Sequence, residues 1–156
     1  MNHELKIKPI GIVQSSLKRL EDCALQERES STEAELLIFP EFVDGLSDLQ
    51  AGDKVILLTW MHLADRTELK THPRNNTNAP LTGVFSTRSP NRPNPIGLHK
   101  VTVLVVMDNL IKVSGLDVLD QTPLIDIKPV IDWRVKGPGR LIGCCKSVAK
   151  LLLFCC

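Results

Sequence analysis

Several features that this 156-residue chain lacks narrow what it can be. It has no run of about 18 or more apolar residues, so we expect no transmembrane helix. Its first eight residues are too polar for a secretory signal, which makes a cytoplasmic location the expectation. No Gly-x-Gly-x-x-Gly follows an apolar run, so a dinucleotide-binding fold has no support.

The cysteines also lack the spacing that is typical of a metal site. Cys23 stands alone, whereas Cys144, Cys145, Cys155 and Cys156 form two adjacent pairs near the C-terminus. An odd number of cysteines without a mark of secretion argues against a disulfide framework. Adjacent cysteines lack the two-residue gap of zinc knuckles, so we expect reduced thiols and no metal.

Charge is nearly balanced overall but unevenly distributed. The formal net charge is +1, and the composition is that of one soluble globular domain. Residues 21–48 hold nine acidic side chains against one basic, whereas residues 66–100 hold six Lys or Arg against one acid. The basic segment favours an anionic partner, and the alternative is an ordinary solvated face.

Short apolar runs between chain breakers predict a mainly β protein. We expect strands at residues 5–13, 33–39, 54–61, 83–87, 97–107, 110–116 and 124–127. The run at 54–61 is nearly all apolar, as in a strand that is buried on both faces. Asp108-Asn109 predicts a tight hairpin turn, and the number of short strands favours a barrel or a sandwich.

Few helices are expected. Residues 47–50 predict a short helical turn, and residues 140–154 carry apolar side chains at helical spacing after Gly137-Pro138-Gly139. We therefore divide the chain into a barrel domain over residues 1–136 and a C-terminal helical extension over residues 137–156.

Residues 83–98 are the most informative stretch: Gly-Val-Phe-Ser-Thr-Arg-Ser-Pro-Asn-Arg-Pro-Asn-Pro-Ile-Gly-Leu. Proline fixes its own φ and restricts the residue before it, so three prolines here stiffen the backbone. Four hydrogen-bonding side chains stand on this stiff loop: Arg88, Ser89, Arg92 and Asn94. Such a display is typical of a site for an anionic or carboxylate-bearing ligand.

This loop resembles the signature of the TsaA-like family, which includes tRNA methyltransferase O. Other blocks are similar to the family in the same order: Ile-Gly-Ile-Val at 10–13, Ile-Phe-Pro-Glu-Phe at 38–42, Leu-Thr-Trp-Met-His at 58–62, and Asp-Gln-Thr-Pro with Asp-Ile-Lys-Pro within 120–129. The resemblance implies a small antiparallel β-barrel that works as a homodimer, binds S-adenosyl-L-methionine and transfers its methyl group. It also implies the acceptor, N6 of the threonylcarbamoyl adenosine beside the anticodon of tRNA.

The resemblance assigns site residues as well. Within the family-like blocks, the two candidate catalytic residues are Asp126 and His62, either of which could take the proton of the acceptor. The cofactor-binding positions that the resemblance implies are Gln26, His62, Leu63, Arg88, Ser89, Arg92, Asn94, Leu98, Thr122, Pro123, Asp126 and Lys128. The cofactor presents a carboxylate, an ammonium, a sulfonium and an adenine, so side chains of both charges are needed.

The chemistry of the loop side chains fits these roles. Arg88 can bind a carboxylate through two parallel N–H bonds, which lysine cannot do. Arg92 can do the same for the cofactor or for RNA phosphate. The alternative for both is an ordinary ion pair with the acidic segment. Ser89 and Asn94 either bond the ligand or cap the turn.

The remaining positions have simpler alternatives. Asp126 and Lys128 alternate with isoleucines and so share one face of a strand, where they form either part of the site or a surface salt bridge worth about 0–1 kcal/mol. Asp126 would hold the cofactor ammonium or accept the proton of the acceptor. His62, at a strand end, is the other candidate base or a structural residue.

Two leucines and two residues near Asp126 complete the predicted pocket. The resemblance implies that Leu63 and Leu98 line the part that holds the adenosine, a role compatible with plain core packing. Thr122 and Pro123 would shape the entrance.

Two departures from the family pattern bear on the acceptor. Where the family has Pro-Arg-Gln, this chain has Ala24-Leu25-Gln26, and Gln121 replaces a glycine. The longer methyltransferases of the family carry an extra C-terminal domain, where this chain has one short predicted helix. The alternatives are therefore a module that binds S-adenosyl-L-methionine without methylating tRNA, or a methyltransferase with a different acceptor.

Overall fold

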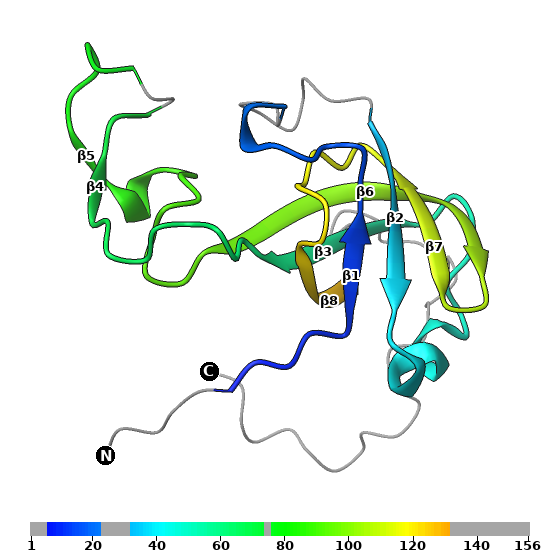
Figure 1. The fold of residues 1–156 in the computed structure, drawn as a ribbon. Helices are drawn as coiled ribbons and strands as arrows, with labels where there is room; N and C mark the ends of the chain where they lie inside the picture. The colour runs from blue at the N-terminus through cyan, green and yellow to red at the C-terminus, as the bar shows by residue number, and fades with distance from the viewer. Residues whose placement is uncertain (1–5, 23–31, 74–75, 132–156) are drawn as a thin grey trace.

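The computed structural model describes residues 6–22, 32–73 and 76–131 (Figure 1). No helix in these segments is long and apolar enough to cross a membrane. Gln26, the predicted helix over 140–154, the C-terminal cysteines and the proposed boundary at 136/137 lie outside the described residues.

Six strands in the described residues close into an antiparallel barrel. They are β1 Gly11–Gln14, β2 Glu33–Ile38, β3 Lys54–Trp60, β6 Ile96–Met107, β7 Leu110–Ser114 and β8 Pro123–Pro129. Their order is β1-β2-β7-β6-β3-β8, and β8 pairs back onto β1. This confirms the predicted small antiparallel barrel. The register of the long strand β6 against β7 shifts between Val103 and Val105, a bulge of the kind that lets a strand curve.

The interior of the barrel is the hydrophobic core. It is filled by alternate side chains of the strands, among them Val13, Leu36, Ile38, Leu57, Val103, Ile111, Val113 and Leu124. The prediction that the 54–61 run is buried on both faces was wrong. Val55 and Leu57 point inward, whereas on the outside Ile56, Leu58 and Trp60 are only partly buried and Lys54 is exposed. A closed barrel has one interior, so the outer apolar residues of β3 are left for other contacts.

Some boundaries differ from the sequence expectation. The first strand begins only at Gly11, and the helical turn expected at 47–50 is instead a 3-10 helix, Pro40–Leu46. Pro40 stands at the first helical position, where its missing N–H costs nothing. The hairpin at Asp108-Asn109 is confirmed, since Met107 pairs with Leu110 and Asp108 has a φ of 48°.

Between β3 and β6 the chain leaves the barrel as an arm, described over residues 61–73 and 76–95, that projects to one side (Figure 1). The arm holds a short hairpin of β4 Lys70–Thr71 and β5 Thr82–Gly83. The strand predicted at 83–87 was wrong beyond Gly83, because Val84–Ser86 form a 3-10 turn. The signature loop, which consists of this 3-10 turn and the proline-rich segment after it, therefore lies on the arm.

Candidate functional site

The signature loop is braced from within by Arg92. Its Nε donates to the carbonyl of Ser89 at 2.8 Å, and its Nη2 donates to the carbonyls of Thr87 at 2.6 Å and Val84 at 3.1 Å. The Ser89 amide donates to the Thr87 hydroxyl at 3.3 Å. These hydrogen bonds give Arg92 a structural role in the loop. They also make the loop stiffer than its prolines alone would.

Arg88 and the other predicted residues of the arm lie near its surface. Arg88, His62, Leu63 and Asn94 are all exposed. The Asn94 carbonyl accepts a 2.8 Å hydrogen bond from the Ile96 amide, which turns the loop into β6. Because the braced loop has little freedom, the backbone of Arg88 is held in a limited region, and the residue is exposed.

The second group of predicted residues belongs to β8 and to the residue that precedes it, Thr122. Asp126 Oδ2 lies 2.7 Å from Lys128 Nζ, which confirms that the two share a face of the strand. Asp126 Oδ1 also accepts a 2.9 Å hydrogen bond from the Ile127 amide. Thr122 is buried, and its carbonyl accepts from the Val13 amide at 2.9 Å. Of this group, Asp126 and Lys128 remain partly exposed to a ligand.

Strand register joins the two groups on the outer face of the barrel. Leu58 of β3 pairs with Leu98 of β6 on one side and with Asp126 of β8 on the other. Side chains of directly paired residues point to the same face, so these three form a row. With strands about 4.8 Å apart, Leu98 and Asp126 stand about 10 Å from each other. We call Leu58, Leu98 and Asp126 the outer row.

The outer row lies at the base of the arm. The next outward pair toward the arm is Trp60 with Ile96, after which the chain leaves the barrel. The register of β8 shifts here, because Leu58 pairs with Asp126 while Thr59 pairs with Leu124, leaving Ile125 as a bulge. Bulges next to sites re-aim side chains. The structure thus brings the arm, Leu98 and Asp126 to one end of one face.

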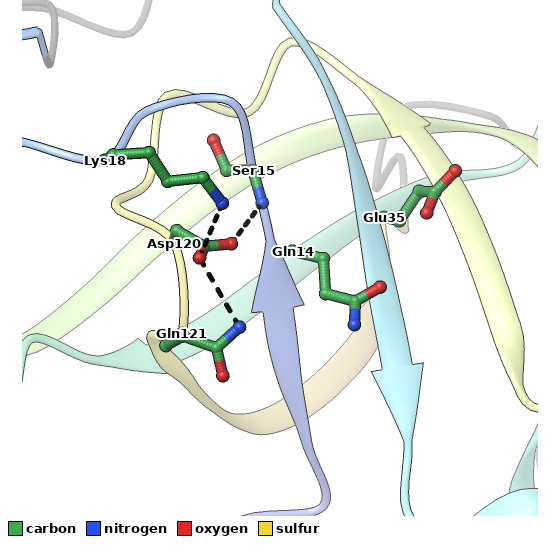
Figure 2. Close-up of a pocket in the computed structure, with 6 residues that line it drawn as sticks. All are labelled: Gln14, Ser15, Lys18, Glu35, Asp120 and Gln121. Carbon is green, nitrogen blue, oxygen red and sulfur yellow. Dashed lines mark hydrogen bonds and ion pairs between the residues drawn. The ribbon is translucent and has the colours of Figure 1, made fainter.

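A shallow polar hollow of about 320 Å³ lies elsewhere, at the end of β1 (Figure 2). Asp120 is at its centre, where its carboxylate accepts from the Ser15 amide at 2.9 Å and lies 2.7 Å from Lys18 Nζ. Lys18, then the Ser15 amide, lowers the pKa of Asp120. The residues that line the hollow are Gln14, Ser15, Lys18, Glu35, Asp120 and Gln121.

None of the residues that line the hollow was predicted as a site residue. The available signal was the position of Asp120 and Gln121 directly before Thr122 in the family-like block. Gln121 has a φ of 62°, in the left-handed region that glycine enters at little cost. Gln121 therefore keeps the backbone turn that the family's glycine would make, at some cost in strain.

No group of three or more His, Cys, Asp or Glu side chains in the described segments could hold a metal ion. The charged candidate residues are instead those that bind polar organic ligands: the Arg88 guanidinium on the arm, and the Asp126 carboxylate and Lys128 ammonium on β8.

A closed antiparallel barrel with a stiff arginine-proline arm and an Asp-Ile-Lys-Pro strand defines a barrel of the TsaA-like type. The chain belongs to the family of the tRNA-methyltransferase O N-terminal domain, whose model matches residues 12–133.

Relatives of similar length come from archaea. The chain is 46% identical over 129 residues to the "S-adenosyl-L-methionine-binding protein" of Archaeoglobus fulgidus, covering 81% of this chain and 91% of that one. It is 44% identical over 126 residues to the "Probable S-adenosyl-L-methionine-binding protein" of Methanothermobacter thermautotrophicus, covering 81% and 90%.

Solved structures agree with the fold. TrmO from P. aeruginosa matches with a TM-score of 0.68 and 27% identity, over 90% of this chain and 61% of that one. The chain therefore spans less than two thirds of that protein. The match confirms the barrel architecture and the resemblance that the signature loop indicated.

Proposed function

We propose that this chain binds S-adenosyl-L-methionine at the outer row and the base of the arm. The observation that carries this is the register that sets Leu98 and Asp126 beside Leu58, near the point where β3 and β6 join the arm that holds Arg88. Arg88 would hold the cofactor carboxylate and Asp126 its ammonium, while the leucines offer apolar surface to the adenosine. The names of the archaeal relatives support the same ligand.

We further propose that the chain is a methyltransferase that acts on N6 of threonylcarbamoyl adenosine in tRNA. When bound, the cofactor supplies a methyl group on a sulfonium that is a good leaving group. The protein's contribution is then mainly alignment, which stiff elements such as the arm loop favour. The lone pair of the acceptor nitrogen is delocalised, so removal of its proton helps. Asp126 or His62 would accept that proton.

Calorimetry tests the cofactor site. Replacement Arg88→Ala should weaken S-adenosyl-L-methionine binding by about 10- to 150-fold, because a hydrogen bond to a charged group is worth about 1.5–3 kcal/mol. Arg19→Ala is the matched control, since Arg19 is also an exposed arginine and pairs with Glu21 at 3.2 Å. Undiminished affinity in Arg88→Ala would show that the assignment is wrong.

Mass spectrometry of tRNA nucleosides tests the acceptor. Incubation of the protein with cofactor and threonylcarbamoylated tRNA should add one methyl group to that nucleoside and to no other. Methylation of a different nucleoside would reassign the acceptor and leave the cofactor site unaffected.

A cofactor-binding module is the second candidate. One observation favours it: relatives that this chain covers for 90% or more of their length are named only for binding S-adenosyl-L-methionine. Binding of the cofactor without methylation of tRNA would support the module over the enzyme.

We also propose that the protein is a homodimer. Large apolar side chains stand exposed along the arm and its base, notably Phe85 at 80%, Leu63 at 60% and Leu98 at 48%. A two-fold interface over this region would cover them and would complete a pocket that is open in one subunit.

A further inference from the structure

Two buried polar side chains face each other inside the barrel, directly beneath the arm. The strands that lead into and out of the arm pair Thr59 with Gly97 and Leu57 with His99. Thr59 is fully buried and His99 is 5% exposed. Thr59 is one position, and His99 three positions, from the outermost pair, Trp60 with Ile96, which forms the neck of the arm.

A hydrogen bond joins these side chains across the neck. His99 Nε2 and Thr59 Oγ1 lie 3.0 Å apart. Buried polar groups are costly unless they are hydrogen-bonded, and here the two buried atoms bond to each other. Gly97 makes room for it, since a Cβ at that position would collide with both Thr59 Oγ1 and His99 Nε2. Gly97 belongs to the signature stretch. A glycine is required at this position because the backbone passes close to the two side chains.

The protonation of His99 depends on its burial and on the charge of Arg88. Burial, and to a smaller extent the charge of the Arg88 guanidinium, lowers the pKa of His99 from 6.5 to about 4. His99 is therefore neutral at pH 7, and a neutral ring can donate or accept in its bond with the Thr59 hydroxyl. A neutral ring also adds no positive charge that would repel Arg88.

We propose that His99 is a positioning residue that clamps the neck of the arm through Thr59 and thereby sets Arg88 against the outer row. His99 follows Leu98 directly, so the strand that presents Leu98 outward is held from the inside by the next side chain. The neck also carries a 2.9 Å hydrogen bond from the Met61 amide to the Pro95 carbonyl, which depends on the two strands staying aligned. This inference rests on the proposed function in one respect, the role of Arg88 in cofactor binding.

The test compares Thr59→Val, which removes the hydroxyl, with Thr59→Ser, which keeps it. We expect Thr59→Val to bind S-adenosyl-L-methionine about tenfold more weakly by calorimetry, the upper range for one lost hydrogen bond, and Thr59→Ser to stay near wild type. His99→Gln, which keeps a donor and an acceptor, should also retain most of the affinity. Hydrogen exchange of the Met61 amide should be about tenfold faster in Thr59→Val alone.

A double-mutant cycle separates positioning from plain stability. Arg88→Ala should cost less affinity in the Thr59→Val background than in wild type, because Arg88 is already displaced there. Additive losses, or wild-type affinity in Thr59→Val with only a lower Tm, would overturn the proposal. Unchanged exchange of the Met61 amide would overturn it as well. Failure of the wild type to bind the cofactor would instead refute the proposed function, while the exchange measurement still decides whether the clamp exists.

Discussion

Asp120 accepts a 2.9 Å hydrogen bond from the backbone amide of Ser15, 105 positions earlier in the chain. The bond ties the end of β1 to the loop before β8, and Lys18 Nζ adds an ion pair 2.7 Å from the same carboxylate (Figure 2). Ser15 is buried, so its amide has little access to water if the carboxylate is lost. Asp120 therefore links β1 to β8, the two strands whose pairing closes the barrel, and we call this link the latch.

The first prediction concerns this latch. Asp120→Ala should destabilise the protein by about 1–3 kcal/mol, because it leaves the Ser15 amide without its acceptor. Lys18→Met should cost less, about 0–1 kcal/mol, since Lys18 is largely exposed. Because the pKa of Asp120 is lowered in the folded state, its contribution is present above the unfolded pKa and is lost as pH falls through the folded pKa. Urea unfolding of both variants between pH 7 and pH 3 checks the order and the direction.

The second prediction concerns His99 and the pH dependence of stability. Its pKa falls from 6.5 to about 4 on folding, so the unfolded chain binds the proton more readily between these values. Stability should therefore decrease as pH falls from about 6.5 to about 4, by at most about 3 kcal/mol from this group. His99→Gln should flatten that part of the profile. A wild-type curve that is level over this range, or a variant with the same slope, would contradict the assignment.

Much of the fold could be predicted from local sequence patterns. Alternating or β-branched runs bounded by breakers located β2, β6 and β7 to within a residue or two. The 84–86 segment was misread as strand because its local composition suits either form. Arg92 and Thr87 hydrogen-bond to the Val84 carbonyl and hold the 3-10 turn, and those contacts depend on the folded loop.

The candidate site was readable in part. The prolines and arginines of the loop are adjacent in sequence, so their joint display could be predicted. The outer row combines three strands that are distant in the chain, and it exists only through their register. The Thr59–His99 bond was missed for the same reason, since a lone histidine in an apolar run gives no sign of its partner 40 positions away.

The third prediction is that Phe85 holds the proposed dimer together. Burying a Phe side chain is worth about 1.5–3 kcal/mol, and a two-fold interface would lose it twice in Phe85→Ser. The dimer dissociation constant should rise by about 100-fold or more. Met107→Ser is the matched control, because Met107 is 54% exposed on the hairpin of the barrel, apart from the arm. Light scattering at micromolar concentration gives the masses, and a monomeric wild type with cofactor bound would exclude the dimer.

The last prediction concerns tRNA and the basic residues of the arm. Arg66 lies with its guanidinium 5.3 Å from the centroid of the Trp60 ring, and Lys70 is exposed on β4. Arg74 lies outside the described residues but belongs to the same basic segment. If these side chains contact phosphate, tRNA binding should weaken as salt rises, because each contact releases counterions.

Replacement of all three basic residues with alanine should flatten the salt slope by up to about three units, one for each lost contact. Cofactor affinity should stay unchanged, since Arg88 and Asp126 are not altered. The matched control replaces three lysines outside the arm with alanine: Lys8, Lys54 and Lys112. Titration of threonylcarbamoylated tRNA at two salt concentrations measures both slopes. Equal and weak binding by the wild type and the arm variant would make the basic segment a solvated face, and the cofactor-binding module would then be the better reading of this chain.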